Sequence, residues 1–433
     1  MNMSMQIRKP QSLRSESLNN GLQTPSVLIE FGYFLILIYA NLGAAFGVAI
    51  SLVGPAALGG LAVICLLHFG TYSWEAFKPI RYPLGCAISI LLVQVLLFQE
   101  SLLHPWNRYF IAWILALLVV QSIALRQGFL HRFAILAFLI GCGTLPFLKI
   151  YGSADEMLRF GGNEDTALGN PNFFGMWFGF CSIYFIVTGL EAKNYIIRTV
   201  SWSAGVFCLY LMAITVSRSP LIGVVIALVF AFQKVLKRSF LPVLGLLLVG
   251  WVVYVSGIFD ELIRYYIHRG GEDTGRSRLW MWAFSGILDS WGMGVGLSNS
   301  FVSLHGDSLY KVGPHNSLLF VWLSSGLIPL AFYLAYLGKA VRGAFRAKNQ
   351  KTSYSPYLLP LVSFAMLELM VLDGVFMSAW HLVVFSLAIG TVSDSRGHRS
   401  TLLDKIPRKN MQKWLDKRSS NSFSKTFIQK NRR

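Results

Sequence analysis

The chain has 433 residues, of which 54% are hydrophobic and 13% are charged, and its mean hydropathy is +0.54. Soluble domains carry roughly 25% charged residues, because their surfaces face water. The composition therefore excludes a soluble globular protein and predicts an all-α polytopic membrane protein.

The formal net charge of +18 arises from 38 Lys and Arg residues against 20 Asp and Glu residues. Twelve of the basic residues lie between positions 396 and 433, and most of the others lie in short segments between apolar runs. Charge placed in this way sets membrane topology and attracts anionic lipid headgroups. No stripe of aromatic and basic residues accompanies it, so nucleic acid is not an expected partner.

Twelve stretches come close to the roughly 20 mostly apolar residues that a membrane helix needs. They lie at residues 27–49, 51–69, 84–99, 108–125, 130–150, 172–190, 198–216, 220–236, 240–258, 316–338, 356–372 and 375–393. The third is short and the last two form a tight hairpin, so eleven spans is the alternative. This membrane domain covers residues 27–393. We expect residues 1–26 to be disordered and residues 394–433 to form a basic tail.

The distribution of Lys and Arg predicts the orientation of the chain. If the N-terminus is cytoplasmic, 29 of the 38 basic residues lie on the cytoplasmic side and nine lie on the other. The bias holds from loop to loop, so both termini are predicted to be cytoplasmic. Three polar segments then lie on the far side of the membrane, at residues 151–171, 216–220 and 259–315.

The longest of these segments, residues 259–315, separates the ninth span from the tenth and is expected to contain short surface helices. Residues 277–288 have the apolar spacing of an amphipathic helix that lies on the membrane surface. Arg276 would be near the N-terminus of this helix, where free backbone N–H groups favour an anion. The alternative is that Arg276 and Arg278 form only its solvated face.

Arg218 lies in the tight turn of residues 216–220, where Pro220 opens the next span. One interpretation is an arginine that extends from the membrane interface into water. The turn is too short to hide the side chain in a solvated loop, so we expect its guanidinium at the mouth of the bundle. There it can hold a phosphate group through two parallel hydrogen bonds.

His315 lies between Pro314 and Asn316, directly before a long apolar helix. Asn316 is a suitable N-cap for that helix. A lone histidine is often structural, and this alternative stays open. A histidine at a rigid helix entrance facing several arginines can also accept a proton from a sugar hydroxyl near neutral pH.

Two carboxylates, Glu368 and Asp373, lie near the outer end of the eleventh span. A carboxylate in an apolar run is a functional candidate, although pairing with an outer arginine explains it equally well. The outer loops contain no Asp-x-Asp sequence, and the five cysteines lie singly in apolar runs. We therefore expect neither a metal nor another cofactor.

The glycines at positions 292, 294 and 296 do not form a dinucleotide-binding fingerprint, because the last glycine of the G-x-G-x-x-G pattern is missing. No parallel sheet is predicted around them either. We expect them to permit a turn and close helix packing.

Taken in order, these motifs resemble the O-antigen ligase and polysaccharide polymerase superfamily. The resemblance covers roughly residues 200–340 and rests on the following residues: Ser217-Arg218, Gly275-Arg276 with Trp280, the glycine turn 292–296, and Pro314-His315-Asn316 with Gly326. Each motif is weak alone, whereas their order, spacing and shared membrane side are specific.

The resemblance implies a bacterial inner-membrane enzyme with a periplasmic active site that works without metal or nucleotide. It implies transfer of a glycan from an undecaprenyl-diphosphate carrier to an acceptor. By motif, Arg218 and Arg276 would bind the diphosphate and His315 would be the catalytic base, with inversion at the anomeric carbon. Arg159, in the outer loop before the sixth span, could be a further phosphate or glycan contact.

The acceptor distinguishes the branches of this superfamily. A polymerase adds the glycan to another lipid-linked repeat unit, a ligase adds it to lipid A-core, and a third branch glycosylates protein. No outer domain that would recognise a large non-glycan acceptor is evident, which favours a polymerase of O-antigen or exopolysaccharide. The partners would be the lipid-linked glycans, membrane lipids and other polysaccharide assembly proteins.

Two other classes of protein remain as alternatives. A transporter or flippase for lipid-linked glycans tends to have repeated halves and charges near the bilayer midplane. This sequence shows no repeat and gathers its outer cations at one face. A non-enzymatic scaffold would tolerate loss of His315 and Arg276, which an enzyme would not.

Overall fold

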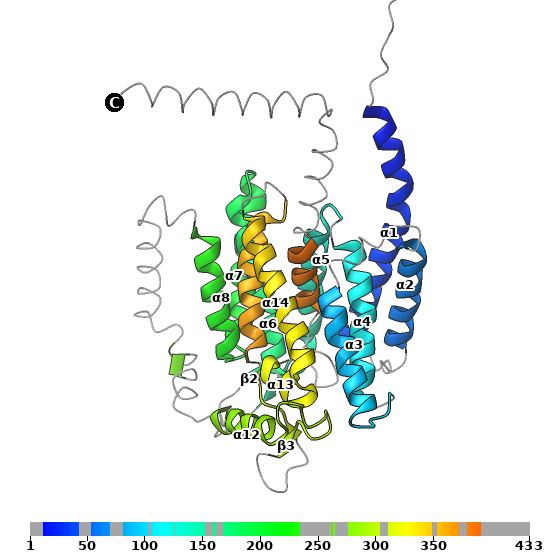
Figure 1. The fold of residues 1–433 in the computed structure, drawn as a ribbon. Helices are drawn as coiled ribbons and strands as arrows, with labels where there is room; N and C mark the ends of the chain where they lie inside the picture. The colour runs from blue at the N-terminus through cyan, green and yellow to red at the C-terminus, as the bar shows by residue number, and fades with distance from the viewer. Residues whose placement is uncertain are drawn as a thin grey trace, which may run out of the picture.

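The computed structural model describes residues 12–42, 53–69, 81–102, 105–124, 126–151, 159–161, 168–233, 260, 263–264, 276–303, 311–348, 353–371 and 379–390. In this part of the chain, helices form a bundle and α12 (Arg276–Asp289) lies across one end of it (Figure 1). We refer to this end as the α12 end.

The remaining helices run roughly along the bundle. They are α1 (Ser12–Leu42), α2 (Val53–Phe69), α3 (Arg81–Leu96), α4 (Pro105–Ile123), α5 (Phe129–Thr144), α6 (Pro171–Glu191), α7 (Tyr195–Ala213), α8 (Arg218–Ala231), α13 (Ser317–Ser325), α14 (Leu327–Ala347), α15 (Ser355–Leu369) and an unlabelled helix, Ala379–Gly390. Two short antiparallel hairpins join them: β1 (Lys149–Tyr151) with β2 (Arg159–Gly161), and β3 (Val302–Ser303) with β4 (Lys311–Val312).

Three helices are long and apolar enough to cross a membrane, namely Phe129–Phe147, Pro171–Glu191 and Tyr195–Ala213. The first of these joins α5 to the 3-10 turn η3 (Leu145–Phe147). Seven shorter apolar helices accompany them in the described ranges. The ninth predicted span, residues 240–258, lies outside the described residues, so the count of twelve stays a prediction.

The outer surface of the bundle is apolar, as a lipid environment requires. Leu28 on α1, Leu139 on α5 and Ile222 on α8 each expose more than half of their surface. Exposed patches of this kind are rare on soluble monomers and mark lipid or protein contacts. The mainly helical structure and this surface agree with the prediction of an integral membrane protein.

Two boundaries differ from the sequence expectations. The helix predicted without a break over residues 316–338 is interrupted at Gly326, which has a φ of 82° and separates α13 from α14. Hydropathy could not reveal this break, because the residues on both sides are apolar. At the other end of the chain, α1 begins at Ser12, within the segment that we expected to be disordered.

Glycines allow the central helices to approach closely, as is common where apolar helices pack in lipid. A Cβ atom at Gly179 of α6 would lie 2.6 Å from Phe364 of α15, and one at Gly223 of α8 would lie 2.7 Å from the same ring. Phe364 in turn stacks on the fully buried Trp380, with 5.3 Å between the ring centroids. This core fixes α15 against both α6 and α8.

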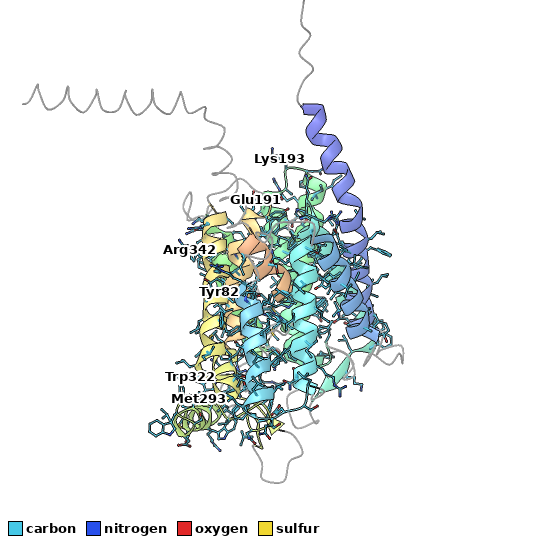
Figure 2. The ribbon with its side chains drawn as sticks, turned by 45° about the vertical axis from the view of Figure 1, so that its right-hand side comes forward. Tyr82, Glu191, Lys193, Met293, Trp322 and Arg342 are labelled. Carbon is cyan, nitrogen blue, oxygen red and sulfur yellow. The ribbon has the colours of Figure 1, made fainter. Side chains whose placement is uncertain are left out.

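The two ends of the bundle differ in their residues. Glu191 and Lys193 lie toward one end, and Met293 and Trp322 lie toward the other, which is the α12 end (Figure 2). Lys193 is among the residues that the charge distribution places on the cytoplasmic side. The separation in space therefore agrees with the separation of the loops that the sequence predicts.

Candidate functional site

The turn between α7 and α8 is strained and firmly held. Val216 has a φ of 49°, which is rare for a β-branched residue, and its side chain is buried. The Oγ1 atom of Thr215 donates a hydrogen bond of 2.7 Å to the Met212 carbonyl, and Oγ of Ser217 donates one of 3.0 Å to Oδ1 of Asn172. Backbone strain of this kind persists only where the surroundings impose it, and it is concentrated at functional sites.

Arg218 is the first residue of α8 and is half-buried. It follows this strained turn directly, so its position is set by the anchored Ser217 and by Pro220, which is buried in the first turn of the helix. The N-terminus of a helix carries free N–H groups that attract anions. The geometry therefore suits the phosphate-binding role expected of Arg218.

The β1–β2 hairpin contacts the same turn. The backbone N–H of Phe160 donates a 3.4 Å hydrogen bond to the carbonyl of Ile214, and Arg159 precedes Phe160 in β2. The part of the chain that was expected to be a loop over residues 151–171 therefore includes a strand. It brings the backbone of Arg159 near the α7–α8 turn.

Glu368 connects α15 to two other helices. It is fully buried, and Oγ of Ser219 on α8 donates a hydrogen bond of 3.3 Å to its Oε2 atom. The carboxylate also interacts electrostatically with Arg276, the first residue of α12. Its other oxygen, Oε1, has no hydrogen-bond partner among the described residues. A buried carboxylate is costly, so its position between Ser219 and Arg276 indicates a specific role.

The two arginines of α12 differ in their surroundings. Arg276 is half-buried and interacts with Glu368, whereas Arg278 is exposed. The sequence left open whether Glu368 pairs with an outer arginine, and the electrostatic effect of Arg276 on Glu368 makes Arg276 the candidate for that pairing. The exposure of Arg278 is typical of a solvated residue or of a peripheral contact.

His315 occupies a second strained position. Its φ is 48°, its side chain is half-buried, and the preceding Gly313 and Pro314 are buried. The side chain of Asn316 caps α13, because its Oδ1 atom accepts hydrogen bonds from the N–H groups of Leu318 (3.0 Å) and Leu319 (3.2 Å). The predicted N-cap is thus present, and the Asn316 oxygen is engaged in it.

Ser317 ties the start of α13 to the end of α15. Its Oγ atom donates a 2.7 Å hydrogen bond to the carbonyl of Leu369, and it accepts one of 3.2 Å from the hydroxyl of Tyr333 on α14. Leu369 is the neighbour of Glu368 in the chain. The segment that carries His315 is therefore adjacent to the Ser219–Glu368–Arg276 contacts.

The glycine turn packs against the break between α13 and α14. A Cβ atom at Gly294 would lie 2.8 Å from the Gly326 nitrogen, and one at Gly326 would lie 2.5 Å from the Met293 carbonyl oxygen. The N–H of Val295 donates a 2.7 Å hydrogen bond to the carbonyl of Leu323. The expectation that these glycines permit a turn and close packing is confirmed.

Gln94 of α3 holds the glycine turn against the end of α13, a role that the sequence did not reveal. It is fully buried; its Nε2 atom donates to the Ser324 carbonyl (2.9 Å) and to Ser325 Oγ (3.0 Å), while its Oε1 atom accepts from the N–H of Leu297 (2.9 Å). One amide thus joins α3, the end of α13 and the glycine turn. Its only sequence signal was an uncharged polar residue inside an apolar run.

Hydrogen bonds join the start of α8 and the start of α13 to the end of α15, at the end of the bundle across which α12 lies (Figure 1). Asp373 lies outside the described residues, and only the backbone of Arg159 is placed. Across the described ranges, no group of three or more His, Cys, Asp or Glu side chains is close enough to hold a metal ion. The site of the described chain is thus composed of arginines, a histidine, hydroxyl groups and one carboxylate.

These features are those of a helical membrane protein with candidate arginines and a histidine toward one end of its bundle. Residues 203–334 match the family described as O-antigen ligase (Wzy_C), and a search of curated proteins finds no match. The matched segment contains Arg218, Arg276, Arg278, His315 and Asn316, whereas Glu368 lies beyond it. The match spans 132 of the 433 residues and supports the resemblance to the O-antigen ligase and polymerase superfamily in this part of the chain. Members of this family are glycosyltransferase-like membrane enzymes of bacteria that act on lipid-linked glycans.

Proposed function

We propose that this protein is a polysaccharide polymerase of the bacterial inner membrane that transfers glycan from an undecaprenyl-diphosphate-linked donor to a lipid-linked glycan acceptor at the periplasmic face. The observation that supports the proposal is that the starts of α8 and α13 are hydrogen-bonded to Glu368 and Leu369 at the end of α15, where Arg276 at the start of α12 also acts electrostatically on Glu368. Each start presents a residue suited to this reaction: Arg218, Arg276 or His315.

The first step is binding of the donor diphosphate by Arg218 and Arg276. Guanidinium groups match phosphate oxygens in pairs, and both arginines begin helices whose dipoles also favour negative charge. Both are half-buried, so their charges act in a medium that is less screened than bulk water. In this proposal Arg278 and Arg159 make outer contacts with phosphate or glycan.

In the transfer step, His315 accepts the proton of the acceptor hydroxyl. The hydroxyl oxygen forms a bond to the anomeric carbon while the bond from that carbon to the diphosphate oxygen breaks, and undecaprenyl diphosphate leaves with the electron pair. Direct displacement inverts the configuration of the anomeric carbon. The arginines stabilise the charge that develops on the leaving group, which is the role that metal ions have in other glycan transferases.

The neighbours of each reacting residue keep it in place. Ser217 and Ser219 on either side of Arg218 are bonded to α6 and α15, and Asn316 and Ser317 after His315 are bonded to α13 and α15. Glu368 orients Arg276 and is a positioning residue. A rigid support of this kind is what precise placement of reacting groups requires.

The proposal is tested by glycan analysis of cells that carry His315→Asn or His315→Ala, with the membrane level of the protein measured in parallel. Asn tolerates the left-handed backbone of this position, so His315→Asn removes the base without added strain. We expect both variants to abolish polymer while lipid-linked repeat units accumulate. Single repeats would identify a polymerase, and accumulated full-length chains would identify a ligase that acts on lipid A-core. Normal polymer from a properly inserted His315→Asn protein would overturn the transferase mechanism in favour of a transporter or scaffold.

A further inference from the structure

α12 has three faces instead of the usual two. Leu279, Ala283 and Ile287 follow one another at intervals of four and are buried, and Ala283 and Ile287 pack on Leu319 and Leu323 of α13. A second apolar face, which is turned by about 115° from this one at 100° per residue, is exposed. It consists of Trp280, Met281, Phe284 and Leu288, which expose 38%, 65%, 46% and 75% of their surface.

Three polar side chains of α12 occupy the third face, whereas the exposed Ser277 lies on the second. The three are Arg278, Ser285 and Asp289, and Oγ of Ser285 donates a 3.3 Å hydrogen bond to Asp289. A helix that covers a soluble domain places polar residues on all of its exposed surface. The second apolar face of α12 therefore indicates a contact with something that is neither the bundle nor water.

The residue after the helix supports this inference. The chain leaves α12 through a turn in which the N–H of Trp291 bonds to the carbonyl of Leu288 and that of Gly292 to the carbonyl of Ile287. Trp291 has a φ of 54°, a conformation that glycine adopts readily and a bulky aromatic residue does not, and yet its side chain is 93% exposed. Its indole therefore gains nothing from the described protein to offset that strain.

The exposed face is continuous with the side of the bundle that faces lipid. Met293 is 62% exposed, and its carbonyl packs against Gly326 at the start of α14. The next two residues of α14, Leu327 and Ile328, are 61% and 67% exposed. The apolar surface thus passes from α12 onto α14 without a polar boundary between them.

We propose that this surface (Trp280, Met281, Phe284, Leu288, Trp291 and Met293, hereafter the α12 apolar face) lies in the headgroup region of the outer leaflet. α12 runs across the bundle end and hence along the plane of the membrane (Figure 1). Tryptophan is enriched at this depth, and amphipathic helices bury their apolar face there. The contact sets the depth of Arg276 in the membrane at the level where the diphosphate of a lipid-linked donor lies. This part of the inference rests on the proposed function.

Depth-dependent fluorescence quenching in proteoliposomes tests the proposal without any donor. The full-length protein, with its five cysteines replaced, carries one cysteine and an environment-sensitive fluorophore at Met281→Cys or Leu288→Cys. Ser285→Cys, on the polar face of the same helix, is the matched control. Lipids brominated at different depths are the quenchers.

We expect the Met281 and Leu288 probes to be quenched most by the shallowest brominated lipid, and the Ser285 probe to be quenched at least several-fold less. Equal and weak quenching at all three positions would overturn the proposal, as would crosslinking of Met281→Cys between two copies, which would make the face a protein interface. Because no donor is present, either result is independent of whether His315 catalyses transfer.

A second measurement connects the contact to catalysis. Trp291→Gly relieves the backbone strain and removes the indole, whereas Trp291→Phe retains an aromatic side chain. We expect Trp291→Gly to raise KM for the lipid-linked donor several-fold with kcat unchanged, and Trp291→Phe to have a smaller effect. A lower kcat with unchanged KM, or no effect at all, would contradict the inferred role in setting the depth of Arg276.

Discussion

The hydroxyl of Ser219 donates a 3.3 Å hydrogen bond to the buried carboxylate of Glu368, so that the start of α8 is joined to the end of α15. Arg218 and Pro220 flank the serine, and Glu368 interacts in turn with Arg276 on α12. Glu368 is thus hydrogen-bonded to the residue that follows Arg218 and is affected electrostatically by Arg276. The following predictions concern this group of contacts and the turns that support it.

Glu368→Gln is expected to reduce glycan transfer at least tenfold. The substitution keeps the shape of the side chain but replaces one carboxyl oxygen by an amide nitrogen, which removes the group that can attract Arg276, and a loss of about 1.4 kcal/mol corresponds to a tenfold change in rate. Transfer from a lipid-linked donor in membranes is the measurement. Ser219→Ala is the matched control, because it removes only one neutral donor, worth about 1 kcal/mol. If Glu368→Gln is as active as the wild type, Glu368 does not position Arg276.

Arg276→Lys is expected to raise KM for the donor about tenfold, since a loss of about 1.4 kcal/mol corresponds to a factor of ten. Lysine keeps the charge but cannot make the paired hydrogen bonds of a guanidinium. Arg278→Lys, two residues away on the exposed side, is expected to change KM by less than about twofold. Equal effects of the two substitutions would show that both arginines act only through general charge.

Asn316→Ala is expected to lower both stability and activity. Loss of an N-cap costs about 1 kcal/mol, and here the freed helix end is the one that holds His315. Asn194 makes the same kind of cap at the start of α7, where its Oδ1 atom accepts from the N–H of Ile196. Asn194→Ala should therefore lower the midpoint of thermal unfolding to a similar extent but leave kcat intact. A parallel loss of kcat in both variants would mean that the Asn316 effect is one of stability alone.

Gly326→Ala is expected to prevent proper folding or to destabilise it by more than about 2 kcal/mol. The added methyl would overlap the Met293 carbonyl, at a backbone φ that already favours glycine. Gly338 in α14 is the matched control, because a Cβ there meets nothing within 4 Å. We expect Gly338→Ala to retain the membrane level and melting temperature of the wild type. Normal stability of Gly326→Ala would show that the break between α13 and α14 tolerates rearrangement.

Local features of this site could be predicted from the sequence, and long-range ones could not. Asn316 before an apolar run is a local cap signal, and Arg276 at the start of an amphipathic segment is a local helix signal. Glu368, on which Arg276 acts electrostatically, lies 92 positions further along the chain. Nothing in the sequence alone distinguishes this carboxylate from one that pairs elsewhere.

The break at Gly326 and the role of Gln94 illustrate a second limit. Gly326 lies between apolar residues, so its neighbourhood has the composition of a continuous span. The need for glycine arises only because the turn at Gly294 packs against it. Gln94 likewise depends on three backbone and side-chain partners more than 200 positions away in the chain. These requirements come from tertiary packing and leave no periodic pattern in the sequence.

The central claim is transfer from a lipid diphosphate with His315 as the base. Its most direct test is reconstitution of the purified protein in liposomes with an undecaprenyl-diphosphate-linked repeat unit, with product length and released undecaprenyl diphosphate measured together. The wild-type protein is predicted to elongate the glycan and to release one undecaprenyl diphosphate for each bond formed. His315→Asn is predicted to be slower by at least about 100-fold, the usual contribution of a general base. Elongation by His315→Asn at the wild-type rate would contradict the account and would leave His315 as a residue of the strained turn alone.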